Sequence, residues 1–300
     1  MNAVKTSFSI KDLECLGGIK AHTIRIWERR YNLLKPERSA TNIRYYSLSD
    51  LTKLLNVAFL LDHDYKISKI AENSSKEIGN LVATIVESSD FGCNANARNS
   101  FKIAMMNFDQ KLFTKTYNGL LETYSFREIF FQIFIPLLEE IGLLWQAGVV
   151  NPAHEHFISN LIKQKILLLI ERTDATESIN TSKTFILFLP ENEIHDLGLM
   201  YLNYEIVSQG YKCIYLGQSI PTESLKYLMN NQTNACFVSY LTVKPSEISV
   251  SKFAQDFNTD LENEDAPLFL LGRLVQNADT DQLPSNVKLI KSIAAFRELL

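Results

Sequence analysis

The stretch Thr184-Phe-Ile-Leu-Phe-Leu-Pro190, followed closely by Glu193-Ile-His-Asp-Leu-Gly198, decides how the C-terminal part of this chain folds. The first run is short and apolar, which is typical of a buried strand. The second has the pattern Glu-x-His-x-x-Gly, so we expect His195 just beyond the carboxyl end of that strand, where open α/β sheets bind ligands. Gly198 leaves room for a flat group to pass close to the backbone. The alternative is a capping or surface histidine, and two other parts of the sequence bear on the choice.

The rest of the C-terminal part alternates between short apolar runs and helical patterns. This alternation favours a parallel, doubly wound α/β sheet of the flavodoxin-like kind. The expected strands are 184–189, 211–216, 235–241, 267–271 and 287–290. The expected helices are about 195–208, 222–230, 246–258 and 292–299.

The composition indicates a globular protein of two or three domains, because 300 residues exceed what one core usually holds. The sequence has no apolar run long enough to span a membrane, and its first residues lack the apolar region of a signal peptide. The four cysteines match neither a zinc spacing nor a disulfide framework. We therefore expect a cytoplasmic protein with no membrane partner.

Charge is divided unevenly along the chain. Residues 1–70 hold 7 Lys and 5 Arg against 4 Asp and 3 Glu, a net charge of +5. The whole chain carries −4, so the remaining residues carry −9. A basic head on an acidic body suggests that only the head meets a polyanion, although a chance imbalance would look the same.

The N-terminal part has the pattern of a helix-turn-helix followed by a wing. A short helix is expected after Ser9, which is placed to cap it, and Gly17-Gly18 turns the chain into a second helix over about 20–30. A polar, extended stretch through Tyr46 fits a hairpin wing. Further helices are expected over 49–61 and 67–82.

The middle of the chain, residues 101–171, is expected to be helical and densely apolar, which predicts a four-helix bundle. Asp109 and Ser125 are candidate helix caps, and Asn151 precedes a proline at a first helical position. Polar stretches at 87–100 and 173–182 are expected to be linkers. The predicted domains are 1–86, 100–172 and 183–300.

The motif Thr23-Ile-Arg-Ile-Trp-Glu-Arg-Arg-Tyr-Asn-Leu-Leu-Lys-Pro-Glu-Arg38, with Asn42-Ile-Arg-Tyr-Tyr46 after it, resembles the MerR family of winged helix-turn-helix transcription regulators. The resemblance covers about residues 7–70 and implies binding to double-stranded operator DNA. The long coiled-coil helix and the cysteine-containing metal loop of typical members are missing. The effector of this chain is therefore expected to be of another kind.

The basic and aromatic side chains of this motif are the candidate DNA contacts. Arg25, near the start of the second helix, can reach base edges or phosphates in the major groove. Arg38 and Arg44 flank the wing and suit backbone contacts, and Tyr31 and Tyr45 can donate to phosphates. Because one head covers a half-site, we expect a dimer or tetramer.

The C-terminal part resembles the cobalamin-binding α/β domains that hold the corrinoid with its own base displaced. In that family an Asp-x-His-x-x-Gly loop supplies the lower cobalt ligand, which implies that His195 is this ligand, with Glu193 in the aspartate position and Gly198 as the glycine. The carboxylate can accept the other imidazole N–H and fix the tautomer. The second family motif, Ser-x-Leu, matches Ser239-Tyr-Leu241, which by resemblance line the slot for the displaced nucleotide tail.

The third motif of that family, a Gly-Gly after the fourth strand, is only half present. It reads Leu271-Gly272, so Gly272 is kept as a candidate cofactor contact and the Leu271 side chain could narrow the tail slot.

The helical middle resembles the bundle that precedes this domain in light-sensing, adenosylcobalamin-dependent repressors of the MerR type. Those carry a Trp, nine residues, then Glu-His, and here Trp145 is followed after nine residues by Glu155-His156. The resemblance implies an indole over the upper corrin face and hydrogen bonds from Glu155 and His156 to the adenosyl group. A histidine directly after the Trp takes the upper cobalt site in the photoreceptors, but this chain has Gln146 there.

The sequence as a whole indicates a transcription regulator controlled by adenosylcobalamin, with light as one signal that could remove the upper ligand. One alternative is a MerR-type regulator that no longer binds cobalamin and responds to a protein partner, such as an antirepressor, and Leu271 favours it. The other is a corrinoid carrier for methyl transfer. No arrangement of nucleophile and base suggests an enzyme.

Overall fold

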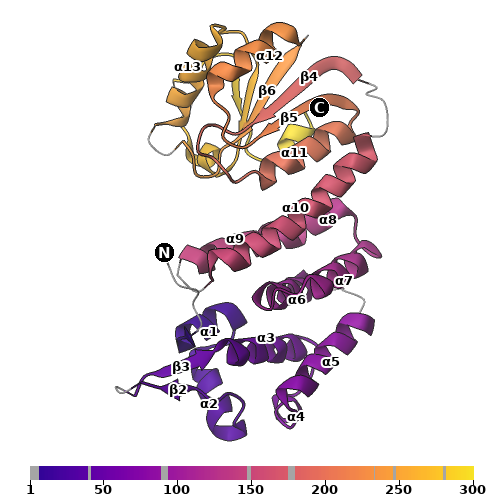
Figure 1. The fold of residues 1–300 in the computed structure, drawn as a ribbon, viewed down its shortest axis with the longest axis vertical. Coiled ribbons are helices and arrows are strands. Elements are labelled where there is room, and N and C mark those ends of the chain that lie inside the picture. Colours follow the sequence, from indigo (N-terminus) through magenta and orange to yellow (C-terminus); the bar gives the residue numbers. More distant parts are fainter. Residues whose placement is uncertain are drawn as a thin grey trace. The chain divides into compact units, whose positions relative to one another are not determined.

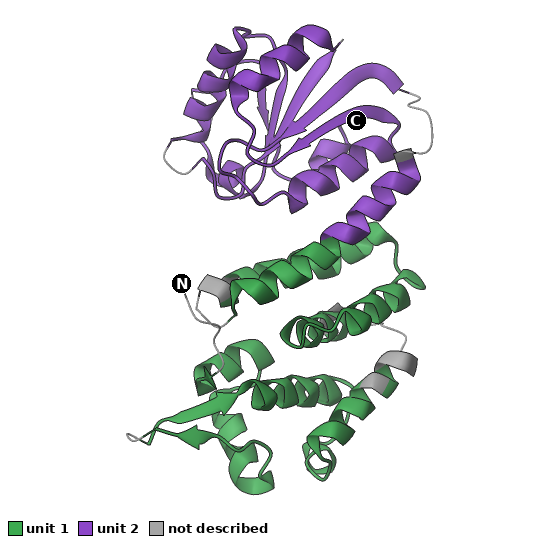
Figure 2. Cartoon of the chain, viewed as in Figure 1, with its two compact units in different colours: residues 1–162 green, residues 163–300 purple. Residues whose placement is uncertain are grey.

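The computed structural model describes residues 7–39, 42–88, 94–146, 150–174, 180–232, 234–245, 248–279 and 282–300. The chain divides into two compact units, Met1–Ile162 and Lys163–Leu300 (Figure 2). The predicted head and most of the predicted bundle therefore share one compact unit. The three-domain division stays a prediction.

The N-terminal part of the first unit is a winged helix-turn-helix, as predicted (Figure 1). Helix α1 (Ile10–Gly17) begins in a capping box, in which Ser9 and Asp12 each accept a hydrogen bond from the other's backbone N–H. Gly18 takes the left-handed conformation, with a φ of 67°, that turns the chain towards α2 (Ala21–Tyr31). Strands β1 (Ser7–Phe8), β2 (Glu37–Arg38) and β3 (Arg44–Ser47) form an antiparallel sheet in the order β1-β3-β2.

The third predicted helix is confirmed, whereas the fourth is divided in two. Helix α3 (Leu48–Asp62) is capped by Ser47, whose hydroxyl accepts the N–H of Asp50. The single helix expected over 67–82 is two helices, α4 (Ile67–Ile70) and α5 (Ser75–Ser88). Ser74 and Glu77 form reciprocal capping bonds of 2.7 and 3.3 Å, and these begin a new helix inside the range predicted as one.

Four helical segments form the predicted bundle. They are α6 (Asn94–Met106), α7 (Gln110–Leu121), α8 (Phe126–Ile129), which continues through a π turn (Phe130–Phe134) into α9 (Ile135–Gln146), and α10 (Pro152–Asp174). Asp109 and Ser125 cap α7 and α8, as expected. Phe101, Phe113 and Phe134 pack together at its centre, with ring centroids 5.0 to 6.2 Å apart. No described helix is long and apolar enough to cross a membrane.

The linker predicted over 87–100 is wrong for residues 94–100, which form the first turns of α6. The asparagines that suggested a loop bind the end of α3 instead. Asn99 donates to Asp62 over 3.0 Å, and Asn96 Nδ2 lies 3.2 Å from Nε2 of His63. Ala97 is fully buried between them. Asparagine is here selected for its side-chain hydrogen bonds and not for turn formation.

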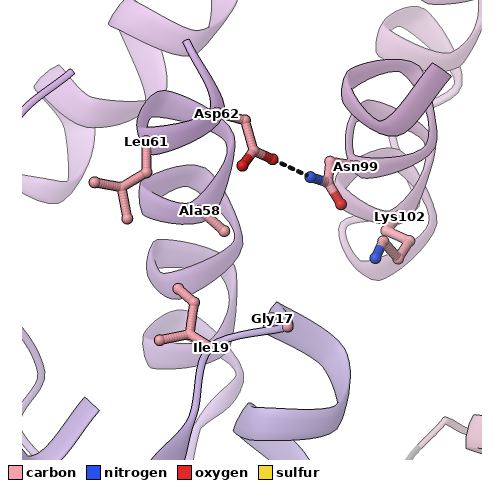
Figure 3. Close-up of a pocket in the computed structure, with 8 residues that line it drawn as sticks. Gly17, Ile19, Ala58, Leu61, Asp62, Asn99 and Lys102 are labelled. Carbon is pink, nitrogen blue, oxygen red and sulfur yellow. Dashed lines mark hydrogen bonds between the residues drawn. The ribbon is translucent and has the colours of Figure 1, made fainter. Parts of the chain in front are cut away.

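A half-open pocket of about 220 Å³ lies beside the contact between α3 and α6 (Figure 3). Its walls come from the turn after α1, from α3 and from α6, and they include Gly17, Ile19, Ala58, Asp62, Asn99 and Lys102. The Lys102 ammonium group, which is nearly buried, lies 2.9 Å from Glu140 of α9. The winged head and the bundle thus meet through paired polar groups around a small space.

The second unit is a five-stranded parallel sheet with helices on both faces, which confirms the doubly wound prediction. The strands are β4 (Asn180–Phe188), β5 (Tyr211–Gly217), β6 (Ala235–Tyr240), β7 (Leu268–Leu271) and β8 (Val287–Leu289). Their order is β5-β4-β6-β7-β8, and residues 180–182, predicted as linker, belong to β4. The helices are α11 (Leu197–Ser208), α12 (Leu225–Asn231), α13 (Val250–Leu261) and α14 (Ile293–Arg297).

Side chains alternate between the two faces of this sheet. Phe188, Phe237 and Leu241 face α12 and α13, where they join one buried cluster. Phe185 and Phe269 face the other side, where both rings contact Phe296 of α14. Helix α11 covers this second face together with α14.

Gly272, after β7, is the position where the backbone tolerates no side chain. Its φ of 105° and ψ of −176° are accessible essentially to glycine alone, and a Cβ atom there would lie 2.4 Å from the carbonyl oxygen of Leu241. We expect Gly272→Ala to lower the unfolding free energy of the second unit by about 3 kcal/mol, measured by chemical denaturation. Gly79→Ala, in α5 with nothing within 4 Å of the added atom, is the control and should be neutral or slightly stabilising. Equal stability of the two variants would contradict this account.

Candidate functional site

A buried carboxylate organises the loop between β4 and α11. Glu193 is fully buried, and its Oε1 accepts the backbone N–H groups of Ile194 and His195, each over 2.9 Å. The same oxygen lies 2.6 Å from Nδ1 of His195. Its Oε2 accepts the N–H groups of Val243 and Lys244, each over 2.7 Å, from the loop after β6. One side chain therefore joins the ends of two neighbouring strands.

Hydrogen bonds keep the carboxyl group of Glu193 ionised. Burial alone would raise the pKa of this carboxyl group, but the hydrogen bonds from the His195 ring and from three backbone N–H groups outweigh burial and lower the pKa to about 2. The carboxylate is placed to accept a proton from Nδ1 of His195, and Nε2 is the other nitrogen of the ring. The His195 side chain is 53% exposed. The structure thus confirms the expected carboxylate–imidazole pair and presents the ring towards solvent.

Two further residues hold this loop, and the sequence did not point to either. Lys163 Nζ lies 2.5 Å from Oδ1 of the nearly buried Asp196, directly after the histidine. Gln218 Nε2 donates to Asp196 Oδ2 over 2.7 Å and to the carbonyl of Ile194 over 2.9 Å. Lys163 belongs to α10, far from His195 in the sequence, so no local sequence pattern predicts the Lys163–Asp196 ion pair.

The residues predicted to line a tail slot lie on one face of the sheet, and their role in binding stays a prediction. Gly198 lies elsewhere, because a Cβ atom there would come within 2.6 Å of the ring of Tyr240. Leu241 faces α12 and α13, and Ser239, two residues before it in β6, faces the same way. Gly272 lies against the backbone of Leu241. The hydroxyl of Ser239 is buried and has no hydrogen-bond partner in the described structure.

The residues predicted to cap the cofactor belong to the first unit. Glu155 and His156 lie in the first turns of α10, and their side chains are paired, with His156 Nδ1 2.8 Å from Glu155 Oε2. The Glu155 side chain is 33% exposed and that of His156 is 66% exposed. The side chains of Trp145 and Gln146 lie outside the described residues. His154, between these positions, is buried and stacks on Phe108 with ring centroids 4.7 Å apart.

The predicted DNA contacts divide into exposed and internally paired groups. Arg25 on α2, Arg38 on β2 and Tyr45 on β3 are exposed, and Tyr31 at the end of α2 is half-buried. Arg38 Nη1 donates to Asn42 over 2.5 Å and thereby braces the turn of the wing.

Arg44 has an internal role that the sequence did not reveal. Its Nε lies 3.1 Å from Oε2 of Glu28 on α2, and the hydroxyl of Tyr46 donates to the other oxygen of this carboxylate. Burial, and then the neighbouring Glu28, raise the pKa of the Tyr46 phenol. Arg44 and Tyr46 therefore fasten the wing to α2, and Arg44 as a phosphate contact stays a prediction.

Comparison with known proteins identifies both parts. Residues 8–76 match the MerR HTH family regulatory proteins, and residues 97–170 match the B12 binding domain. The chain joins a MerR-type DNA-binding domain to a B12-binding domain. The second match falls on the helical bundle that carries Trp145, Glu155 and His156.

Several known proteins are similar over most of this MerR-type chain. The HTH-type transcriptional repressor CarH of Myxococcus xanthus is 26% identical over 214 residues, which are 70% of each chain. The repressor CarA of the same organism is 24% identical over 72% of this chain and 70% of its own. The monomethylamine corrinoid protein of Methanosarcina barkeri has a similar fold, with a TM-score of 0.57 and 12% identity over 69% of this chain and 98% of its own.

Glu193 should make the second unit sensitive to acid. Its pKa is lowered in the folded protein, so its contribution is complete above the unfolded pKa of about 4.5 and is lost as the pH falls towards 2. We expect the unfolding free energy of the wild type to fall by on the order of 3 kcal/mol over this window because of this one group. Glu193→Gln should remove that part of the pH dependence while being less stable at pH 7. Parallel pH profiles of the two proteins, measured by denaturant unfolding, would contradict the assignment.

The different roles assigned to Arg25 and Arg44 can be tested by measuring DNA binding and thermal stability. We expect Arg25→Ala to weaken binding to an operator selected in vitro from random duplexes, and to lower the salt dependence of binding by about one counterion. Arg44→Ala should instead lower the thermal stability of the head, because it leaves Glu28 half-buried without its ion pair. Loss of DNA affinity by Arg44→Ala with unchanged melting would show that Arg44 is mainly a phosphate contact.

Proposed function

We propose that this protein is a DNA-binding transcription regulator whose activity is controlled by cobalamin. The observation that carries the proposal is the Glu193–His195 pair at the carboxyl end of β4, in a chain that also has a MerR-type head and a B12-binding match. Neutral imidazole with a carboxylate behind it is the arrangement by which proteins present a nitrogen ligand to a transition metal.

The residues present fit a corrinoid at two points. His195 would hold the cobalt from below through Nε2, because Glu193 keeps the proton on Nδ1 and raises the basicity of the ring. The buried, unpartnered hydroxyl of Ser239 suits a polar group of a ligand. When bound, the cofactor would supply a cobalt whose upper ligand can be exchanged or lost. The protein's own part is to hold and orient the ring system and to exclude water from its faces.

The upper face belongs to the first unit in this proposal. Trp145 would cover the corrin ring, and Glu155 and His156, which already pair with each other, would bind the adenosyl group. The adenosyl form and the response to light rest on the resemblance of the spacing of Trp145, Glu155 and His156 to that in light-sensing repressors of the MerR type. Gln146 in place of the expected histidine makes light the part of the proposal that most needs its own test.

The route from the bundle to the DNA runs through α6 and α3. Asn99 and Asn96 on α6 bind Asp62 and His63 at the end of α3, and α3 packs directly on α1 of the head. A change in the bundle would reach the head through these bonds and shift the population that binds DNA. The proposal includes double-stranded operator DNA, a cytoplasmic location, a dimer or tetramer, and a protein antirepressor as a further partner.

The two alternatives make different demands. A regulator that has lost cobalamin would be consistent with Leu271. That alternative does not explain why the buried carboxylate of Glu193 pairs with the exposed ring of His195. A methyl carrier would share the fold of the Methanosarcina corrinoid protein, but that likeness at 12% identity concerns the fold alone. The MerR-type head favours regulation over transfer chemistry.

An absorbance spectrum tests the proposal directly. The full chain is mixed in the dark with adenosylcobalamin, desalted and measured before and after green light. We expect a retained corrinoid spectrum, and we expect His195→Ala to lower the affinity at least about tenfold because the cobalt ligand is gone. His22→Ala, which removes an exposed histidine of the head, is the matched control.

Each outcome decides one part. Retention with a change after illumination supports cobalamin and light, whereas retention without a change supports cobalamin and removes light. A wild type that retains no corrinoid overturns the proposal. Unchanged affinity of His195→Ala would remove this histidine as the ligand.

A further inference from the structure

Tyr240 occupies the space beside the histidine loop that the glycine of the motif would otherwise leave open. A Cβ atom on Gly198 would lie 2.6 Å from Cε1 and 2.7 Å from Cζ of Tyr240. Such contacts are far shorter than van der Waals distance, so the aromatic ring lies directly on the backbone of the first turn of α11. A residue with a side chain at position 198 would therefore clash with the ring of Tyr240.

Leu271 fills the neighbouring position on the same face. The register of β6 and β7 pairs Tyr240 with Leu271, so both side chains point to the side of the sheet that α11 covers. Leu271 is 1% exposed. Tyr240 and Leu271 are therefore cross-strand neighbours on this face, and the ring of Tyr240 lies against Gly198.

This arrangement bears on the ligand of the proposed function, on which the inference rests. A cobalamin held by a protein histidine has its own dimethylbenzimidazole base displaced, and this planar base must lie within reach of the histidine. Gly198, three residues beyond His195, is a position where a planar group could approach the backbone, but the ring of Tyr240 already lies there. A nucleotide tail could take that place only by moving Tyr240.

We propose that Tyr240, supported by Leu271, determines which corrinoid the α/β domain accepts, by competing with the nucleotide tail for the face of Gly198. The domain then favours corrinoids with a small lower base or none. The competition requires ring volume and not the phenol hydroxyl. Tyr240→Phe should therefore behave as the wild type, whereas Tyr240→Ala should open the face.

The experiment compares two corrinoids that differ only in the tail. Aquocobalamin and diaquocobinamide, which lacks the nucleotide, are titrated into the full chain, and binding is followed by the absorbance change on histidine ligation. We expect the wild type to bind cobinamide more tightly than cobalamin. Tyr240→Ala should raise the cobalamin-to-cobinamide affinity ratio by about tenfold or more, because bulk removed from a packed face leaves a space that the base can fill.

Two controls separate selectivity from general damage. Tyr227→Ala removes an exposed tyrosine of α12, on the other face of the sheet, and should leave the ratio unchanged. Leu271→Gly should change the ratio in the same direction as Tyr240→Ala, so the proposal survives if one variant fails to fold. The melting temperature of each variant is recorded without corrinoid.

The outcomes distinguish this inference from the proposed function. Binding of cobinamide that depends on His195, with a ratio unaffected by Tyr240→Ala and Leu271→Gly, would overturn the inference and leave the proposed function intact. A wild type that binds cobinamide through His195 and binds cobalamin only weakly, with cobalamin binding raised by Tyr240→Ala, would support the inference. Absence of binding in every variant would overturn both.

Discussion

The carboxylate of Glu193 is the group on which the arrangement of loops at the carboxyl end of the sheet depends. A fully buried charge is costly unless it is paired, and here four backbone N–H groups and one imidazole satisfy it. Those bonds tie the loop after β4 to the loop after β6, so the position of His195 is set by two strands. The shorter aspartate common at this position in similar domains is replaced by a longer side chain that reaches both loops.

A carboxylate also joins two elements in the N-terminal winged helix-turn-helix. Glu28 receives Arg44 and Tyr46 from the wing, so a carboxylate on α2 sets where the wing lies relative to the helix expected in the major groove. Charged residues in such a motif thus have two uses. Some face outward to a polyanion, and others fix the angle at which the outward ones are presented.

The sequence predicted the architecture well because periodicity and capping are local. Apolar runs marked all five parallel strands within a few residues, and Ser9, Asp109 and Ser125 cap helices as expected.

Prediction from the sequence failed where the role of a residue depends on a distant partner. The asparagines before Ser100 indicated a linker, yet they bind the end of α3, more than thirty residues earlier. Lys163 and Gln218 hold the histidine loop from other elements, and no spacing could have indicated them. Which motif residues share a face of the sheet also required the strand register, which separates Ser239 from Gly198.

The ring of Tyr240 on Gly198 has a consequence for the protein without its cofactor. A recess built only for a ligand is either hydrated or empty when the ligand leaves, and an empty apolar recess costs stability in proportion to its volume. A chain that fills the recess with its own side chain keeps its packing in both conditions. The ligand-free protein is therefore expected to keep this region packed, which limits the local unfolding that exposes a chain to proteolysis.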